Sequence, residues 1–115
     1  MITIYGIPNC DKVKKARTWL DKHSARYQFH NYKVMGCDQN LADNLLQCFS
    51  YNEIINKRGT TWRKLSENSR NSLDEITARK LIQEQPSLIT RPIFEIDGEW
   101  MLGFNEKLLA GKILE

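Results

Sequence analysis

The feature that most constrains this chain is a cysteine placed between a predicted strand and a predicted helix. Residues 2–5 form a short apolar run, and a turn containing Gly6, Pro8 and Asn9 leads directly to Cys10. From residue 11 onward the apolar residues recur at helical spacing. A cysteine at the start of a helix meets free N–H groups and the positive end of the helix dipole, which favour the thiolate. Cys10 is therefore the predicted nucleophile.

The competing interpretation of Cys10 is a small buried residue, because most cysteines are inert and pack like other small apolar side chains. Its position in a strand–turn–helix segment, rather than its residue type, favours the reactive interpretation. Lys12, Lys14 and Lys15 add positive charge nearby, partly offset by Asp11.

Length and composition narrow the class of protein. The 115 residues are predicted to form one domain, and 41% hydrophobic and 27% charged residues are ordinary for a soluble globular chain. A net charge of +3 without a dense Lys/Arg block argues against direct nucleic-acid binding. No apolar run or N-terminal signal pattern predicts a membrane segment or export, so we expect a cytoplasmic protein.

The cysteine spacing predicts free thiols and no metal site. The count of three is odd, and there is no Cys-x-x-Cys and no His paired with Cys at ligand spacing. Cys48 lies seven residues after Leu41 on the apolar side of a predicted helix, which predicts core packing. Cys37 lies in a Gly-Cys-Asp turn, which favours exposure, and it could resolve an oxidised Cys10 only within disulfide reach.

The order of predicted elements gives the fold class. A helix over about 11–23 and an alternating strand over 26–32 complete a βαβ unit with parallel strands. Asp38 is a predicted N-cap, and Ser72-x-x-Glu75 predicts a capping box opening a helix that stops at Pro86. The polar stretch 51–71 predicts only a short helix through 53–55. Residues 38–85 are thus expected to form an all-helical insertion.

The C-terminal part completes this plan. Apolar residues 93–96 and 100–102 flank Asp97-Gly98, a strong hairpin signal, and Asn105 is expected to cap a last helix over 105–114. The predicted class is α/β: a thioredoxin-like βαβ…ββα domain with an all-helical insertion between the second strand and the C-terminal β-hairpin.

Two arginines are candidates to act with Cys10. Arg58 precedes Gly-Thr-Thr in a turn, and Arg91 precedes a proline at a strand start. Guanidinium groups bind carboxylates and oxyanions bidentately, and a nearby cation lowers a thiol pKa. Residue chemistry alone does not separate Arg58 from Arg63 or Arg70.

Four segments together resemble the ArsC/Spx family, most closely its YffB-type branch of small bacterial proteins. The resemblance runs the whole length of the chain, and its motifs are residues 5–11, 58–65 (RGTTWRKL), 91–93 and 102–104. It implies a thioredoxin-like fold with a helical insertion and a single catalytic cysteine at Cys10. It also implies that Arg58 and Arg91 bind the oxyanion or glutathione, with Asn9 and a cis Pro92 beside them.

The resemblance implies a glutathione-dependent thiol–disulfide reductase. Glutathione would be the co-substrate, and no cofactor would be bound. The substrate would be a glutathionylated or other thiol, and the protein would be a monomer. Arsenate reduction is one alternative, although the family's third oxyanion-binding arginine would fall near Phe104. The other is an Spx-like regulator that binds the C-terminal domain of the RNA polymerase α-subunit. Val13 stands three positions after Cys10, so the Cys-x-x-Cys switch of many Spx proteins is absent.

Overall fold

The computed structural model describes residues 1–114, which fall into two compact units. The sheet unit comprises residues 1–32 and the chain from residue 91 onward, and the helical unit comprises residues 33–90. The helical unit is inserted between the second and third strands, as the sequence predicted. The prediction that both units act as one thioredoxin-like domain stays a prediction.

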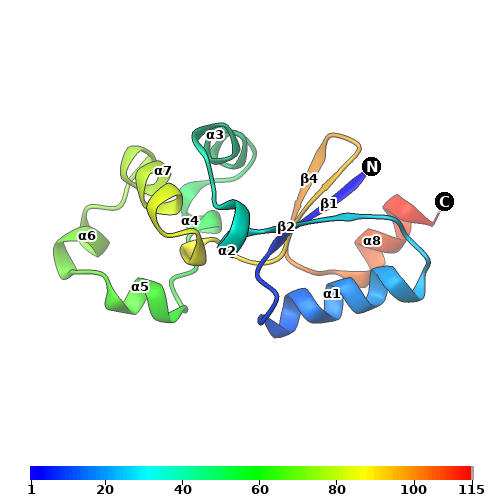
Figure 1. Ribbon diagram of the computed structural model, residues 1–115. Coiled ribbons are helices and arrows are strands. Elements are labelled where there is room, and N and C mark those ends of the chain that lie inside the picture. Colours follow the sequence, from blue (N-terminus) through cyan, green and yellow to red (C-terminus); the bar gives the residue numbers. More distant parts are fainter. Residues whose placement is uncertain (115) are drawn as a thin grey trace. The chain divides into compact units, whose positions relative to one another are not determined.

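The sheet unit contains a four-stranded mixed sheet in the order β2-β1-β3-β4 (Figure 1). Strand β1 pairs parallel with β2 and antiparallel with β3, and β4 pairs antiparallel with β3. The unit's elements are β1 (Ile2–Gly6), α1 (Asp11–Lys22), β2 (Gln28–Asn31), β3 (Ile93–Ile96), β4 (Glu99–Leu102) and α8 (Glu106–Ile113). This is the predicted βαβ unit followed by a hairpin and a helix.

The core of the sheet unit lies between the sheet and its two long helices. Strand residues alternate sides, so Ile4 and its cross-strand partner Phe94 lie in the core together with Leu20 of α1 and Leu109 of α8. All four are fully buried. On the opposite side of β1, Tyr5 donates its hydroxyl hydrogen to Glu95 at 3.2 Å. In α1 the apolar residues that recur at helical spacing, Leu20 among them, form the side of the helix that is buried.

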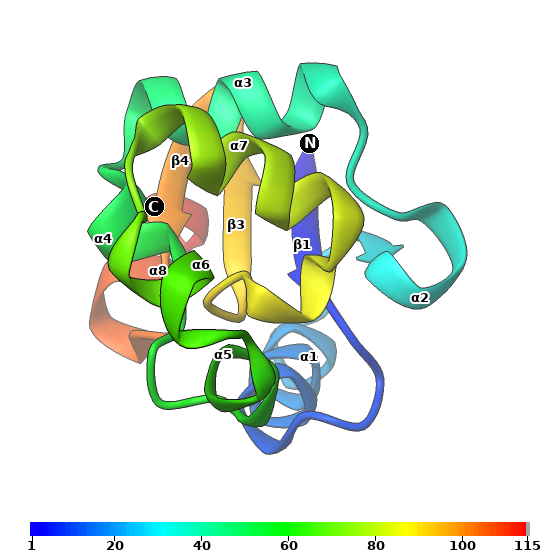
Figure 2. The same cartoon turned by 90° about the vertical axis from the view of Figure 1, so that its left-hand side faces the viewer.

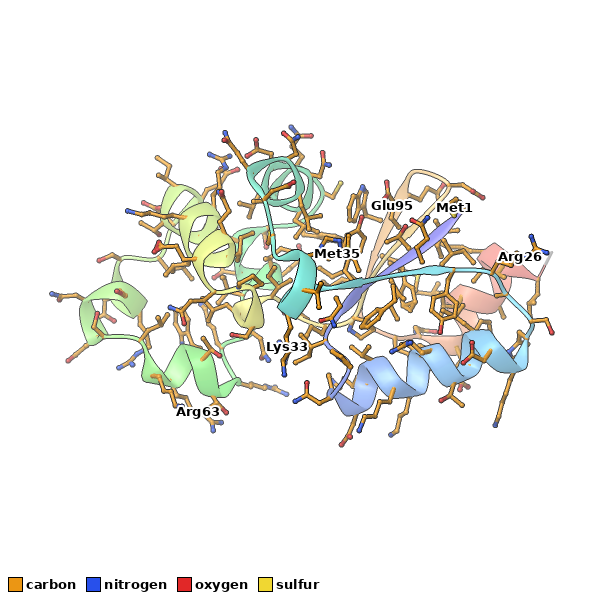
Figure 3. The ribbon with its side chains drawn as sticks, viewed as in Figure 1. Met1, Arg26, Lys33, Met35, Arg63 and Glu95 are labelled. Atoms are coloured by element: carbon orange, nitrogen blue, oxygen red, sulfur yellow. The ribbon has the colours of Figure 1, made fainter. Side chains whose placement is uncertain are left out.

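The hairpin and the last helix confirm two local predictions. Asp97 and Gly98 both have positive φ, 50° and 86°, as a two-residue I′ hairpin turn requires. The N-terminal amine binds the Asp97 carboxylate at 2.6 Å, and Met1 lies at this end of the sheet (Figure 3). The Asn105 side chain accepts a hydrogen bond from the Leu108 N–H and caps α8.

The helical unit consists of short helices. Helix α3 packs against α7, and α7 against η1, and α3 and α7 lie side by side in Figure 2. A short antiparallel bridge joins Ile55 to Ile89. The elements that belong wholly or mainly to this unit are α2 (Tyr32–Met35), α3 (Gln39–Cys48), α4 (Tyr51–Ile54), α5 (Thr60–Lys64), α6 (Glu67–Asn71), α7 (Glu75–Glu84) and η1 (Pro86–Leu88).

Helix caps in this unit confirm one prediction and correct another. The Asp38 carboxylate accepts the Leu41 N–H at 2.8 Å and starts α3, as expected. The capping box of α7 is formed by Asp74 and Thr77 rather than by Ser72 and Glu75. Ser72 is occupied in closing α6, because its hydroxyl donates to the Asn68 carbonyl at 2.6 Å. The Ser72 capping-box prediction was therefore wrong by two residues.

Candidate active site

A close approach between β1 and α1 positions the cysteine. A Cβ atom added at Gly6 would lie 2.6 Å from a methyl carbon of Val13, a distance that real Cβ atoms essentially never show. Glycine at the end of β1 thus lets the first turn of α1 pack directly on the strand. Asn9 is exposed in the intervening turn. In the sequence Gly6 indicates only the end of a strand, because its packing against Val13 has no local signal.

Cys10 is the N-cap residue of α1 and is partly buried. Partial burial alone would raise the pKa of the Cys10 thiol. The Val13 N–H, the Arg91 side chain and the Lys12 N–H outweigh burial, and the pKa lies below its ordinary value. These groups all interact favourably with negative charge on sulfur, so the site stabilises the thiolate.

Arg91 and Pro92 lie in the same unit as Cys10. The Arg91 side chain hydrogen-bonds to the Cys10 sulfur and also acts on it through its charge. The Arg91–Pro92 peptide bond is cis, as the resemblance implied, and Pro92 is buried. Of the predicted site residues, the structure thus brings Cys10 and Arg91 into contact.

The loop after β4 lies next to the cis-proline, Pro92. The Gly103 N–H donates to the Pro92 carbonyl at 2.8 Å. Phe104 follows directly and packs, partly buried, against the core cluster on which Cys10 also packs. An aromatic side chain therefore stands on the loop that adjoins the cis-proline, where the resemblance would place a third arginine.

Arg58 belongs to the helical unit. It is exposed in the turn before α5, and its backbone N–H donates to the Asn56 side chain at 3.1 Å. Its predicted action on the substrate of Cys10 stays a prediction. Arg70 is now distinguished from Arg58, because its guanidinium donates to the carbonyls of Arg63 and Leu65 and so closes α5.

Cys37 differs from its expected exposure. It is buried, with 6% of its surface exposed, and it belongs to the helical unit. Burial, together with the neighbouring Asp38 carboxylate, raises the pKa of the Cys37 thiol to about 12. The turn position was misleading because α3 begins at the next residues and packs its apolar side inward. The Cys37 thiol is protonated at neutral pH.

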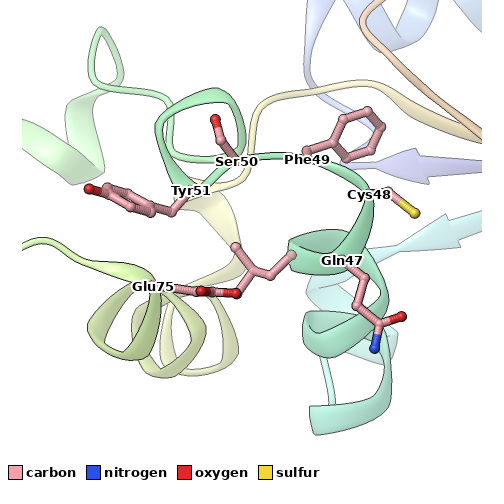
Figure 4. A pocket seen from close by; sticks show the side chains of 7 residues that line it. Gln47, Cys48, Phe49, Ser50, Tyr51 and Glu75 are labelled. Atoms are coloured by element: carbon pink, nitrogen blue, oxygen red, sulfur yellow. The ribbon is translucent and has the colours of Figure 1, made fainter.

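Cys48 is exposed, although its helical spacing predicted core packing. It is the last residue of α3 and lines an open pocket of about 420 Å³ with Leu46, Phe49 and Tyr51 (Figure 4). The helical spacing places Cys48 on the apolar side, but as the last residue of α3 it is exposed.

The described residues offer neither a metal site nor a membrane span. Among residues 1–114, no group of three or more His, Cys, Asp and Glu side chains has an arrangement that could hold a metal ion. No helix in this part of the chain is long and apolar enough to cross a membrane.

The mixed sheet, the cysteine at the start of α1 and the cis-proline beside it define a thioredoxin-like protein. A family model described as the ArsC family matches residues 5–110, and the chain belongs to this family. A solved structure of a protein named YFFB superposes with a TM-score of 0.93 at 40% identity, covering 98% of this chain and 99% of that one.

Two other relatives show how far the family extends. An arsenate reductase (ArsC) related protein from Brucella melitensis is 44% identical, with a TM-score of 0.78 and 96% of this chain and 92% of that chain covered. The global transcriptional regulator Spx of Streptococcus mutans is 33% identical over 114 residues, covering 92% of this chain and 78% of Spx. The chain is thus similar to both reductase-related and regulatory members, with YffB-type proteins among the similar structures.

Proposed function

We propose that this protein is a glutathione-dependent thiol–disulfide reductase in which Cys10 is the nucleophile. The observation that carries the proposal is the contact between the Cys10 sulfur and the Arg91 guanidinium at the start of α1. A stabilised thiolate is the form that attacks a disulfide. Family membership supports reductase chemistry in general.

Glutathione is proposed because Cys10 has no partner thiol of the Cys-x-x-Cys kind. Val13 occupies that position and is fully buried. Cys37 is a poor resolving thiol because burial and Asp38 raise its pKa to about 12. A second thiol must therefore come from solution, and glutathione also offers two carboxylates for which guanidinium groups are suited.

The proposed reaction is two successive thiol–disulfide exchanges. The Cys10 thiolate attacks the glutathione sulfur of a mixed disulfide, forms a Cys10–glutathione disulfide and releases the substrate thiolate, which takes up a proton. A second glutathione thiolate then attacks that disulfide, releases oxidised glutathione and restores the Cys10 thiolate. In the net reaction one glutathione thiol is consumed, and the glutathionylated substrate becomes a free thiol while its glutathione unit leaves in oxidised glutathione. In this scheme Arg91 and Arg58 hold glutathione carboxylates, with Asn9 and Pro92 beside them.

Arsenate reduction is less well supported by the same site. Replacing one arginine of a three-arginine oxyanion site by Phe104 removes a charge-assisted hydrogen bond worth about 1.5–3 kcal/mol, roughly ten- to a hundredfold in binding. An Spx-like role is the other candidate, favoured by the 33% identity to Spx. Pull-down with the C-terminal domain of the RNA polymerase α-subunit tests it directly.

The decisive experiment follows the reduction of a glutathionylated peptide by glutathione, coupled to glutathione reductase and NADPH. We expect Cys10→Ser to abolish the activity and the double variant Cys37→Ser/Cys48→Ser to retain it. Arg91→Ala should raise the pKa of the Cys10 thiol and shift the activity profile to higher pH. Full activity in Cys10→Ser, or a pH profile indifferent to Arg91, would overturn the proposal. Arsenate in place of the peptide tests the alternative substrate.

A further inference from the structure

A groove runs along one side of α1, away from the cysteine. It has a volume of about 330 Å³ and is formed by α1 and the loop that precedes α8. Its lining residues are Lys14, Lys15, Thr18, Trp19, Lys22, Phe104 and Glu106. All of these residues belong to the sheet unit. Cys10 caps this same helix and lies one helical turn before Lys14, the first lining residue.

Two backbone hydrogen bonds relate the segments that form the groove to Cys10 and Pro92. The Lys14 N–H donates to the Cys10 carbonyl at 2.9 Å, which puts Lys14 one helical turn beyond the nucleophile. At the other wall, Phe104 follows Gly103, whose N–H donates to the Pro92 carbonyl. The helix that Cys10 caps therefore forms one side of the groove, and the loop bonded to the cis-proline forms part of the other.

The charge and the apolar surface of the groove indicate its ligand. Three lysines line it against one carboxylate, Glu106, and the lysines are exposed. Within residues 1–114 none of these lysines forms an ion pair. The Trp19 and Phe104 rings give the groove an apolar floor. An anionic ligand with some apolar surface is complementary to this lining.

The distance along α1 from Cys10 to Lys22 distinguishes a polypeptide ligand from glutathione. An α-helix rises about 1.5 Å per residue, so Lys22 lies roughly 18 Å along the helix from Cys10. Glutathione is a tripeptide, and an extended residue spans at most about 3.6 Å, so it reaches about 10 Å in all. Its carboxylates cannot extend from a disulfide at Cys10 to Lys22. A polypeptide can, about five residues from its disulfide.

We propose that this groove binds an acidic segment of a polypeptide substrate, about three to six residues from the cysteine whose mixed disulfide Cys10 attacks. The inference rests on the proposed reductase function and adds to it the class of substrate. Glutathione is held at the cysteine, while the flanking acidic chain lies along α1 with its carboxylates toward Lys14, Lys15 and Lys22. Salt should weaken the interaction, because the lysines are exposed to solvent.

The test uses two peptides that differ only in charge. One carries glutamates at positions three to six on both sides of its central residue, and the matched peptide carries glutamines there. In the binding arm the central residue is serine, and anisotropy of the labelled peptide is measured with the Cys10→Ser protein. In the kinetic arm the central residue is glutathionylated cysteine, and kcat/KM is measured with the wild-type protein.

We expect the acidic peptide to be preferred in both arms, by about tenfold at low salt. Lys22→Glu should remove most of that preference, and Lys22→Gln, which removes the positive charge without reversing it, part of it. Lys107→Glu on α8 makes the same charge change outside the groove lining and should leave the preference in place. Circular dichroism of each variant checks that α1 is retained.

Three outcomes are informative. Equal binding of the two peptides would overturn the inference, and so would a preference that Lys22→Glu and Lys107→Glu reduce equally. Binding that depends on Lys22, with no reduction of either glutathionylated peptide, would support an acidic-peptide groove while refuting the reductase function. The two proposals therefore fail separately.

Discussion

Each of the two units carries a cysteine next to the start of a long helix, and the two thiols have opposite properties. Cys10 is itself the N-cap of α1, whereas Cys37 lies one position before Asp38, the N-cap of α3. The pKa of the Cys10 thiol is lowered by the Val13 and Lys12 N–H groups and Arg91, although partial burial opposes them. The pKa of the Cys37 thiol is raised to about 12 by burial and by Asp38.

The comparison shows that proximity to a helix N-terminus does not by itself activate a cysteine. The free N–H groups are directional and serve whichever side chain occupies the cap position. At α3 the Asp38 carboxylate takes that position and accepts the Leu41 N–H at 2.8 Å. Cys37 therefore meets a negative charge where Cys10 meets a guanidinium. Burial, the larger cause, and the Asp38 carboxylate thus raise the pKa of Cys37, whereas the groups around Cys10 lower its pKa.

The largest expected difference is in alkylation rate at pH 7. A pKa of about 12 leaves about one Cys37 thiol in a hundred thousand ionised at pH 7, whereas a free cysteine, with a pKa of about 8.5, is ionised at least about a thousandfold more. Cys10 should exceed that free cysteine, because its pKa is lowered. The more basic thiolate is intrinsically more nucleophilic, which offsets part of this ratio. In a Cys48→Ser background we expect iodoacetamide to modify Cys10 at least about fiftyfold faster than Cys37. Mass spectrometry of the peptides measures the two rates.

The control for that measurement is the unfolded chain. In guanidinium chloride the two cysteines should react at similar rates, because both environments are lost. Equal rates in the native protein would contradict the comparison.

The next largest effect concerns the packing that places Cys10 at the cap. Gly6→Ala would put a Cβ atom 2.6 Å from a Val13 methyl carbon. Overpacking of this kind costs about 1–3 kcal/mol in the free energy of unfolding. Urea unfolding should show this loss, and native alkylation of Cys10 should slow while that of Cys37 is unchanged.

Two variants check this explanation. Val13→Ala should relieve part of the loss when combined with Gly6→Ala, so the double variant should be less destabilised than the sum of the single ones. Gly111→Ala is the matched control, because a Cβ atom there meets nothing within 4 Å. In α8 it should instead raise stability by about 0.5–1 kcal/mol. A similar loss for both glycine variants would argue against a specific clash at Gly6.

A smaller effect is expected at the cap of α3. Asp38→Ala removes the acceptor of the Leu41 N–H and should lower the free energy of unfolding by about 1 kcal/mol, measured in urea. Asp38→Asn keeps a side-chain acceptor and should cost much less. An equal loss for the two substitutions would indicate that the charge, rather than the cap, stabilises the helix.

Local signals were sufficient for the elements that frame the site. The turn before Cys10, the Asp38 and Asn105 caps and the Asp97-Gly98 hairpin each depend on a few neighbouring residues, and the structure confirms them. The same local logic placed Arg91 before a strand. Its contact with Cys10 depends on the antiparallel pairing of β1 with β3, which the sequence indicated only through the family resemblance.

Burial was predicted poorly where it depends on partners distant in sequence. Cys37 and Cys48 were assigned from turn position and helical spacing, and both assignments were reversed by what packs on each end of α3. Helices α5 and α6 were missed because they are short and polar and bury no residue fully. The predicted role of Arg58, a residue of the helical unit, stays a prediction, because no local pattern relates it to Cys10.

The smallest expected effect separates the two causes that protect Cys37. Asp38→Asn removes the neighbouring negative charge but leaves the thiol buried, and burial is the larger cause of the raised pKa. The pKa of the Cys37 thiol should therefore fall only partway and stay above its ordinary value. Alkylation of Cys37 at pH 9 should become slightly faster, with Cys10 in the same sample as an internal reference. A rate that approached that of Cys10 would mean that the carboxylate, and not burial, keeps Cys37 protonated, and that a single charge separates the two cysteines.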